Sequence, residues 1–316
     1  MMNNRTKKIT HGAMMAAVFV VLTAASVYVP VLNIVSALFL PVPIAWYSAT
    51  YGARASALFA AAAALLTFVV GGIAALPLAL LFIPFGLAVG LSIHAKKSKL
   101  FLFMSAAMAL LIATLVEYAG AMLLLEINFL MEPIDRLREA GEAIGSRSEE
   151  LGGLPEGYGA WLADTVHTLE MMLPSAFILS VFLLAWLLLL ADLPILGRMG
   201  LNVPKFPPFR GMKLPKSILW YYLVVLLSPY LFNFEEGTLA YSAVLNASVI
   251  LQVLLFLQGV SFYHYYIHQQ GWPKWSAVLA TFLAVPLAGF TGIVGIIDLG
   301  FNIRGLVKQA DESKRK

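Results

Sequence analysis

The sequence predicts an all-α fold, a polytopic transmembrane helical bundle of about eight to ten spans. Three observations lead to this class. The 316 residues are 60% hydrophobic and only 12% charged, and the mean hydropathy is +0.85. A soluble domain carries about twice that share of charged residues. Several apolar runs also reach about 20 residues, the length that crosses a hydrocarbon core.

Nine apolar segments are expected to span the membrane: 11–29, 33–50, 54–70, 73–93, 100–126, 172–193, 217–232, 241–263 and 275–300. Pro30, Pro41 and Pro43 are expected to kink or end helices. The last segment is interrupted by Pro286 and several glycines, so we expect two short helices or a re-entrant hairpin there. Three regions follow from this pattern. An N-terminal group of five helices covers 1–126, an extracytoplasmic loop covers 127–171, and C-terminal helices cover 172–316.

The distribution of Lys and Arg predicts the orientation. With the N-terminus inside, the inner connections hold thirteen basic residues and the outer loops hold three. The inner residues are Arg5, Lys7, Lys8, Arg54, Lys96, Lys97, Lys99, Arg198, Lys205, Arg210, Lys213, Lys216 and Lys274. The C-terminal tail carries five more Lys and Arg and is expected to lie on the same side. We therefore expect a multi-pass membrane protein with both termini in the cytoplasm.

Two connections have features of their own. In the outer loop, residues 132–144 place apolar side chains at helical spacing, which predicts an amphipathic helix on the outer surface. That helix would be a lid over an outward cavity or a packing helix at the interface. The inner loop 194–216 is rich in proline and basic residues. Lys205, Arg210 and Lys213 in this loop would dock a partner protein or anchor the chain to anionic lipid head groups.

Polar residues within spans are costly and are therefore candidate functional residues. Glu117 lies near the middle of the 100–126 segment, with Thr114 one turn before it and Gly120 about one turn after it on the same face. Three interpretations stay open for Glu117: a solute or proton site, a structural pair with another helix, or a carboxyl group kept neutral. The candidate solute-binding set consists of Glu117, Thr114, Tyr118, Asn246 and Gln252.

Other polar residues are expected to have structural roles. Asn246, Gln252 and Gln258 are six residues apart, so they cannot all line one pocket, and at least one should bond a neighbouring helix. Asp298 and Asn302 share a face, and Arg304 follows near the membrane edge. An Asp298–Arg304 pair would hold the last helix in place.

Several functions are not supported by any motif. The chain has no cysteine, which excludes disulfides, thiolate metal sites and a cysteine nucleophile. It has no P-loop sequence, no catalytic constellation and no sign of nucleic-acid binding. His264 and His268 have a spacing that suits a metal, but no third ligand is near in the sequence. We therefore expect no enzyme activity, no metal and no cofactor.

The first apolar segment begins with small residues. Gly12/Ala16 and Ala13/Ala17 are each four apart, a spacing that lets another helix approach closely. We expect this small-residue stripe to be a close-packing face. The partner would be another helix of this chain or a helix of a separate protein.

The N-terminal part, from "ITHGAMMAAVFVVLTAASVYVP" to "GLAVGLSI", resembles the substrate-binding S components of energy-coupling-factor vitamin transporters. In that family an Ala-x-x-x-Ala stripe on the first helix, matched here by Ala13 and Ala17, docks on the coupling subunit. Over nearly its whole length, including the final "GIIDLGFNIR", the chain resembles the YybS-like bacterial membrane proteins, a group of unknown function that is distantly similar to S components. This resemblance implies a bacterial inner-membrane location.

Two functional hypotheses follow. The first is uptake of a small, vitamin-like solute that is bound near Glu117, with separate coupling and ATPase subunits, since the chain has no ATP motif. The second is a membrane scaffold or regulator of a signalling enzyme. The second implies a partner such as a cyclic-dinucleotide phosphodiesterase, because the resembled group is often encoded near one. The lipid bilayer is a partner in both.

Overall fold

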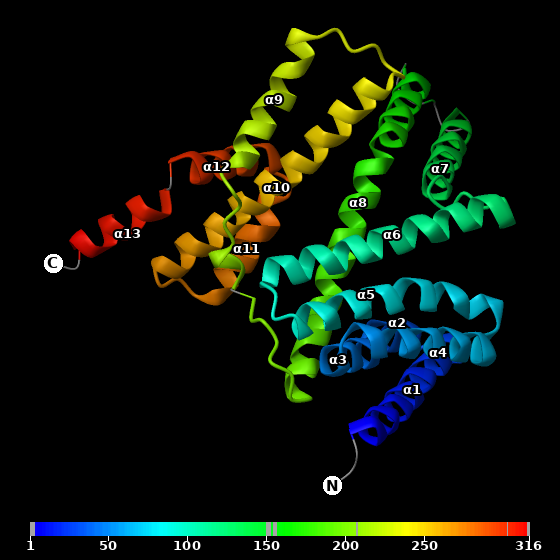
Figure 1. Cartoon of the computed structure of the whole chain (residues 1–316). Helices are drawn as coiled ribbons and strands as arrows, with labels where there is room; N and C mark the ends of the chain where they lie inside the picture. The colour runs from blue at the N-terminus through cyan, green and yellow to red at the C-terminus, as the bar shows by residue number, and fades with distance from the viewer. Residues whose placement is uncertain (1–3, 150–152, 154–156, 207, 302, 315–316) are drawn as a thin grey trace. The chain divides into compact units, whose positions relative to one another are not determined.

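The computed structural model describes residues 4–149, 153, 157–206, 208–301 and 303–314, and within these residues every regular element is a helix (Figure 1). The all-α class predicted from the sequence is confirmed. The helices are α1 (Asn4–Tyr28), α2 (Asn33–Phe39), α3 (Pro41–Tyr51), α4 (Ala53–Gly71), η1 (Ile73–Ala75), α5 (Leu76–His94), α6 (Lys99–Leu125), α7 (Glu132–Glu149), α8 (Tyr158–Arg198), η2 (Phe209–Gly211), α9 (Ser217–Leu231), α10 (Leu239–Gln269), α11 (Lys274–Ala284), α12 (Ala288–Phe301) and α13 (Ile303–Lys314).

Seven of the nine expected spans are long and apolar enough to cross a membrane within the described residues. The pair α2 and α3 counts as one of them, broken at Leu40, where Pro41 begins the second helix. The expected span 275–300 is the pair α11 and α12, which bends by 115° at its break. The expected interruption of this segment is therefore confirmed, and the pair is either a broken span or a re-entrant hairpin. The remaining expected span, 217–232, is α9, which has only 15 residues and contains Pro229.

The chain forms two compact units. The first contains Met1–Pro133 and Phe177–Lys205, so the second half of α8 joins the helices α1 to α6. The second contains Ile134–Ala176 and Phe206–Lys316.

The crossing of α3 and α5 forms the core of the first unit. A Cβ atom built on Gly90 would lie 2.4 Å from the carbonyl oxygen of Ala45, and one built on Gly86 would lie 2.8 Å from the Cβ of Ile44. Side chains larger than hydrogen would therefore force these helices apart. Phe85 and Ile44 are fully buried beside the crossing. This short separation makes α3 and α5 the rigid centre of the unit.

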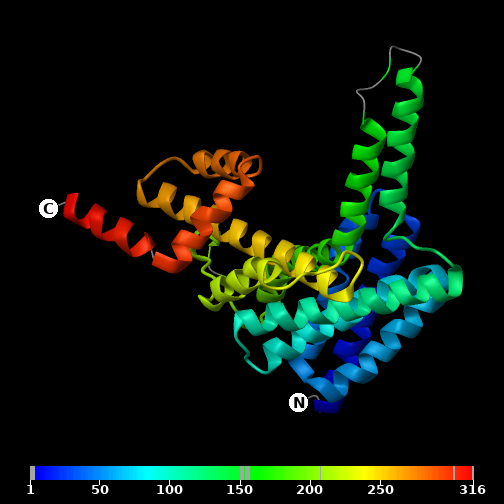
Figure 2. The same cartoon turned by 90° about the horizontal axis from the view of Figure 1, so that it is seen from above.

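Helix α7 and the first half of α8 form an antiparallel pair in the second unit, and Figures 1 and 2 both show them side by side. Helix α7 covers the amphipathic segment predicted from the sequence. Gly141 faces Leu162 closely, and the Tyr158 hydroxyl donates to the Gly141 carbonyl at 3.2 Å. Arg138 forms an ion pair with Glu170 at 2.5 Å. The stretch that pairs with α7 continues into the next apolar span within one helix, because α8 is 41 residues long.

The other close crossing in the second unit joins α10 and α12. A Cβ atom on Gly259 would lie 2.1 Å from the carbonyl oxygen of Thr291, and one on Gly295 would lie 2.0 Å from that of Leu255. Both positions therefore need glycine, since backbone atoms cannot move aside as side chains can.

Candidate functional site

Glu117 lies in the membrane-spanning helix α6 of the first unit, and its side chain is partly buried. The Oε1 atom is shielded from solvent and accepts no hydrogen bond from any described residue. A buried polar group without a partner costs free energy, more so when it is charged. The structural pair with another helix, one of the three interpretations left open by the sequence, finds no donor to Oε1 among the described residues.

The neighbours of Glu117 on α6 differ in what their polar groups do. Thr114 donates to the carbonyl of Leu110 in its own helix, at 2.8 Å. The Tyr118 hydroxyl donates to the Asn128 side-chain oxygen at 3.1 Å, so it ties α6 to the turn that follows. A Cβ atom added to Gly120 would meet no atom of the described chain within 4 Å. The face that carries Glu117 is therefore open one turn beyond the carboxyl group.

Asp192 lies one residue before the end of the expected span 172–193. The structure places it inside α8, with its side chain fully buried and neither carboxyl oxygen bonded to a described residue. The sequence could have indicated this burial, because the apolar run continues past Asp192 through Ile195 and Leu196. Asp192 and Glu117 thus each have a buried carboxyl oxygen that no described residue of the chain bonds, and both lie in the first unit.

Asn246, on α10 of the second unit, has a structural role. Pro174 interrupts the hydrogen bonding of α8, because its ring removes a donor and displaces the neighbouring turn. The Asn246 side chain accepts from the backbone N–H of Ser175 at 2.8 Å and donates to the carbonyl of Met171 at 3.0 Å. In a regular helix these two groups would bond to each other. Asn246 therefore bridges the gap at the proline.

The other two amides of α10 face different surroundings. Gln252 is exposed and donates to Ser248 of its own helix at 2.8 Å. Gln258 is fully buried and donates to the Asp298 carboxylate at 2.5 Å. The separation expected from the six-residue spacing is thus present. Of the five candidate solute-binding residues, Thr114, Glu117 and Tyr118 belong to the first unit, and Asn246 and Gln252 belong to the second.

A buried polar network surrounds Asp298 in the second unit. The Nε and Nη2 atoms of Arg304 each lie 2.9 Å from its Oδ2 atom, which gives the pair expected from the sequence. Arg304 also donates to the carbonyl of Arg210 at 2.9 Å and to the Ser261 hydroxyl at 3.1 Å. Asn302, which was grouped with these residues, lies outside the described residues.

This network also holds the basic segment, residues 208–216. Ser261 Oγ lies 2.9 Å from the carbonyl of Phe209 and 3.0 Å from that of Met212. The backbone N–H of Leu214 donates to the Gln258 side chain at 3.0 Å. The side chains of Arg210 and Lys213 are exposed. The segment is therefore held by its backbone and presents its basic side chains outward. Lys205, the third residue of the proposed docking set, belongs to the first unit.

The small-residue stripe of α1 divides between two faces. Gly12 and Ala16 are half-buried, and a Cβ atom on Gly12 would lie 3.4 Å from the ring of Tyr47. Ala13 and Ala17 are exposed on the described chain. The inward face of α1 carries other residues, including Met15 and Phe19, both buried. The stripe is therefore not one flat face: half of it packs within the unit and half faces outward.

The two histidines of α10 do not share a site in the structure. His264 lies 2.7 Å from the Thr281 hydroxyl and packs edge-on against the ring of Phe209. His268 lies in the last turn of α10. Both the hydrogen bond and the ring contact explain His264 as part of the packing between α10 and its neighbours.

Comparison with known proteins gives a family model and a relative of similar length. The model of a family described as "Predicted membrane protein (DUF2232)" matches residues 17–299. The chain is 27% identical to the uncharacterized protein YybS of Bacillus subtilis (strain 168) over 309 residues, which is 96% of this chain and 99% of that protein. No solved structure matches the chain.

Proposed function

The chain belongs to the DUF2232 family of predicted membrane proteins, and we propose that it is the solute-binding component of a membrane uptake system. The first unit would bind a small organic solute that offers a hydrogen-bond donor or a positive charge. Binding rather than catalysis would be its role, and separate subunits would couple ATP hydrolysis to transport. The protein would lie in the bacterial inner membrane with both termini in the cytoplasm.

The observation that carries this proposal is the unpartnered Oε1 atom of Glu117. Intramembrane acids are usually paired, or they face a cavity or substrate path. Because no described residue donates to this atom, a donor from a bound solute would remove the cost of burying it. The open space at Gly120, on the same face of α6, leaves room beside the carboxyl group.

The number of helices in the first unit also supports the solute-binding proposal. The second half of α8 adds one helix to the five expected from the N-terminal sequence. The unit thus approaches the size of the S components that this part of the sequence resembles. Ala13 and Ala17, exposed on α1, stand where the resemblance implies contact with a coupling subunit.

The test compares the small molecules retained by purified variants. Wild-type protein, Glu117→Gln and Glu126→Gln would be purified in a gentle detergent and extracted for mass spectrometry. Glu126 is a matched control, because it is exposed and lies just after the same helix. We expect a metabolite that co-purifies with wild-type protein and with Glu126→Gln, and that is lost from Glu117→Gln.

Thermal unfolding of the three proteins shows whether the Glu117→Gln variant is folded. With folding intact, equal retention of every metabolite in the three proteins would contradict the solute-binding role of Glu117. Mass spectrometry of co-purifying proteins tests the second part of the proposal, since ATPase and coupling subunits are expected.

A second function is favoured by the basic segment 208–216. Its backbone is fixed by Ser261, Gln258 and Arg304, which presents Arg210 and Lys213 in a set arrangement. Such a surface suits an acidic face of a membrane-associated signalling enzyme, for instance a cyclic-dinucleotide phosphodiesterase. In this alternative the protein is a scaffold or regulator.

The two functions predict different results. The scaffold predicts that Arg210→Gln combined with Lys213→Gln releases the captured enzyme, while Glu117→Gln does not. Arg147→Gln, which changes a basic residue in α7, is the control. Capture that is unaffected by the double substitution would contradict the scaffold.

A further inference from the structure

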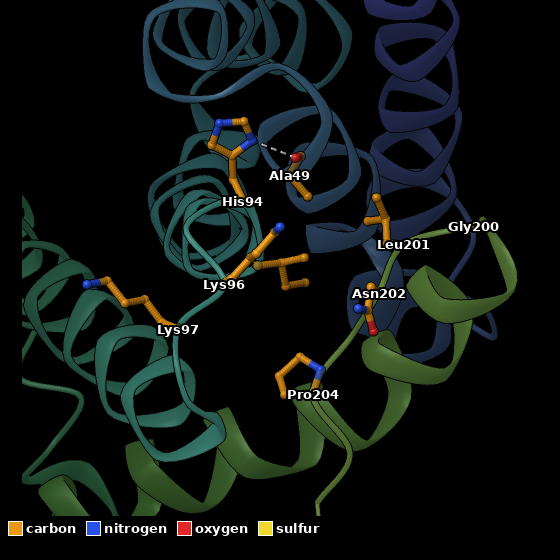
Figure 3. Close-up of a pocket in the computed structure, with 9 residues that line it drawn as sticks. Ala49, His94, Lys96, Lys97, Gly200, Leu201, Asn202 and Pro204 are labelled. Carbon is orange, nitrogen blue, oxygen red and sulfur yellow. Dashed lines mark hydrogen bonds between the residues drawn. The ribbon is translucent and has the colours of Figure 1, made fainter.

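A pocket of about 400 Å³ opens in the first unit, between the end of α5 and the turn that follows α8. Figure 3 shows these two segments facing each other across it. The residues that carry the argument are Ala49, His94, Lys96, Lys97, Asn202 and Pro204. Among the residues that the structure describes, no acidic side chain lines the pocket.

The position of Lys96 is unusual for a lysine. It follows the end of α5 with a backbone φ of +50°, in the left-handed region. The backbone N–H of Lys96 bonds to the carbonyl of Ile93, and that of Lys97 bonds to Ser92. Helix ends of this type usually have glycine at such a position, because glycine has no Cβ atom to clash. The lysine is therefore held in a conformation that its side chain disfavours.

The two lysines at this helix end point in different directions. In Figure 3 the Lys96 ammonium group extends into the space between Ala49 and Leu201, whereas Lys97 extends away from it. The Lys97 ammonium group lies over the ring of Phe101, 5.4 Å from its centre. His94 is held back, because its Nδ1 atom lies 2.8 Å from the carbonyl oxygen of Ala49. Lys96 is thus the charged group presented to the pocket.

The pocket lies where apolar helices end. Helix α5 ends at His94 and α8 at Arg198, so the pocket is at the level expected for lipid head groups. The Trp46 indole N–H donates to the Met199 carbonyl at 3.4 Å, which fixes the turn after α8 against α3. Tryptophan is typical of the membrane interface. Basic pockets between membrane helices bind anionic head groups.

We propose that this pocket binds a phosphate group, that of an anionic phospholipid head group, through Lys96. The exposed Asn202 side chain, which also lines the pocket, supplies an amide hydrogen-bond donor beside it. This role is independent of any solute bound near Glu117. A soluble phosphate compound shares the same chemistry, so the experiment separates the two sources.

The experiment measures thermal unfolding of the full-length protein in detergent, with three additions in parallel: phosphatidylglycerol, phosphatidylcholine and inorganic phosphate. The variants are Lys96→Gly, Lys96→Gln and the matched control Lys99→Gln, which changes an exposed lysine at the start of α6, outside the pocket lining. Glycine suits the left-handed backbone, so Lys96→Gly is expected to fold at least as well as wild type. We expect phosphatidylglycerol to raise the unfolding midpoint of wild type and of Lys99→Gln, and phosphatidylcholine to leave it unchanged.

Both Lys96 variants should need roughly five to ten times more phosphatidylglycerol for the same rise, the loss expected for one basic contact to a head group. Stabilisation by inorganic phosphate that depends on Lys96 would support the phosphate site and assign it to a soluble ligand. Equal responses of the Lys96 variants and wild type to phosphatidylglycerol would overturn the proposal. Lys96 would then only complement the carbonyl groups at the end of α5.

Discussion

Replacing Gly295 by alanine tests the packing of α10 against α12. The added methyl group would lie 2.0 Å from the carbonyl oxygen of Leu255 and 3.0 Å from the backbone nitrogen of Gly259. Ordinary contact begins at about 3.4 Å. Because both neighbours are backbone atoms, the helices must separate by about 1 Å or more, which forfeits roughly a quarter to a half of the dispersion energy at the crossing.

The magnitude follows from two opposing terms. Overpacking of this kind costs about 3 kcal/mol when no side chain can turn aside. Alanine favours a helix over glycine by about 1 kcal/mol. We therefore expect Gly295→Ala to lower the free energy of unfolding by about 2 kcal/mol. Gly292→Ala is the matched control on the same helix. Its Cβ atom would meet nothing within 4 Å, so it should be neutral or up to about 1 kcal/mol more stable.

The assay is reversible unfolding in mixed micelles, in which the SDS fraction is raised and far-UV circular dichroism is recorded. The free-energy difference between the two alanine variants should be about 2 to 3 kcal/mol, the sum of the opposite effects. Unfolding of Gly295→Ala at the same SDS fraction as Gly292→Ala, or at a higher one, would refute the close crossing.

Two further predictions concern the polar bonds of the second unit. Asn246→Leu should lower the free energy of unfolding by about 1–3 kcal/mol, because two backbone groups of α8 lose their partner. In a Pro174→Ala background the helix can form its own hydrogen bond at this point, so the same substitution should cost less. Gln252→Leu is the exposed control on the same helix. Arg304→Gln should cost about 3–5 kcal/mol, since it leaves the fully buried Asp298 without its counter-charge. Adding Asp298→Asn should recover part of that loss, and unfolding in the same micelles measures both cycles. Strict additivity in either double variant would contradict the proposed contact.

Most helices were predictable because their spans are long apolar runs whose ends carry charge or proline. The break inside the last span was also predictable, since Pro286 and its glycines cannot continue a regular helix. The small-residue stripe shows where prediction from sequence spacing fails. Gly12 and Ala13 are adjacent, so about 100° of rotation separates them, and they face different neighbours.

The candidate sites depended on contacts that spacing does not reveal. Glu117 could be found because any acid in mid-span is conspicuous. The role of Asn246 could not, because its partner Ser175 lies 71 residues earlier in the chain. The pocket at Lys96 likewise requires the 200–204 turn, about a hundred residues further on. The left-handed backbone at Lys96 could not be predicted either, because the residue there is not a glycine.

The two units differ in how their buried polar groups are satisfied, and this difference separates structure from function. In the second unit Gln258 and Arg304 converge on Asp298, and only its Oδ1 atom lacks a described partner. In the first unit Glu117 and Asp192 have buried oxygens with no partner in the described chain. Buried polar groups without a partner in the chain are rare in folded proteins, and they are usually bonded by a ligand, an ion or a water molecule. The first unit is therefore where an added molecule should stabilise the protein most. Substitutions in the second unit should act chiefly through folding and through the basic segment 208–216 that its network holds.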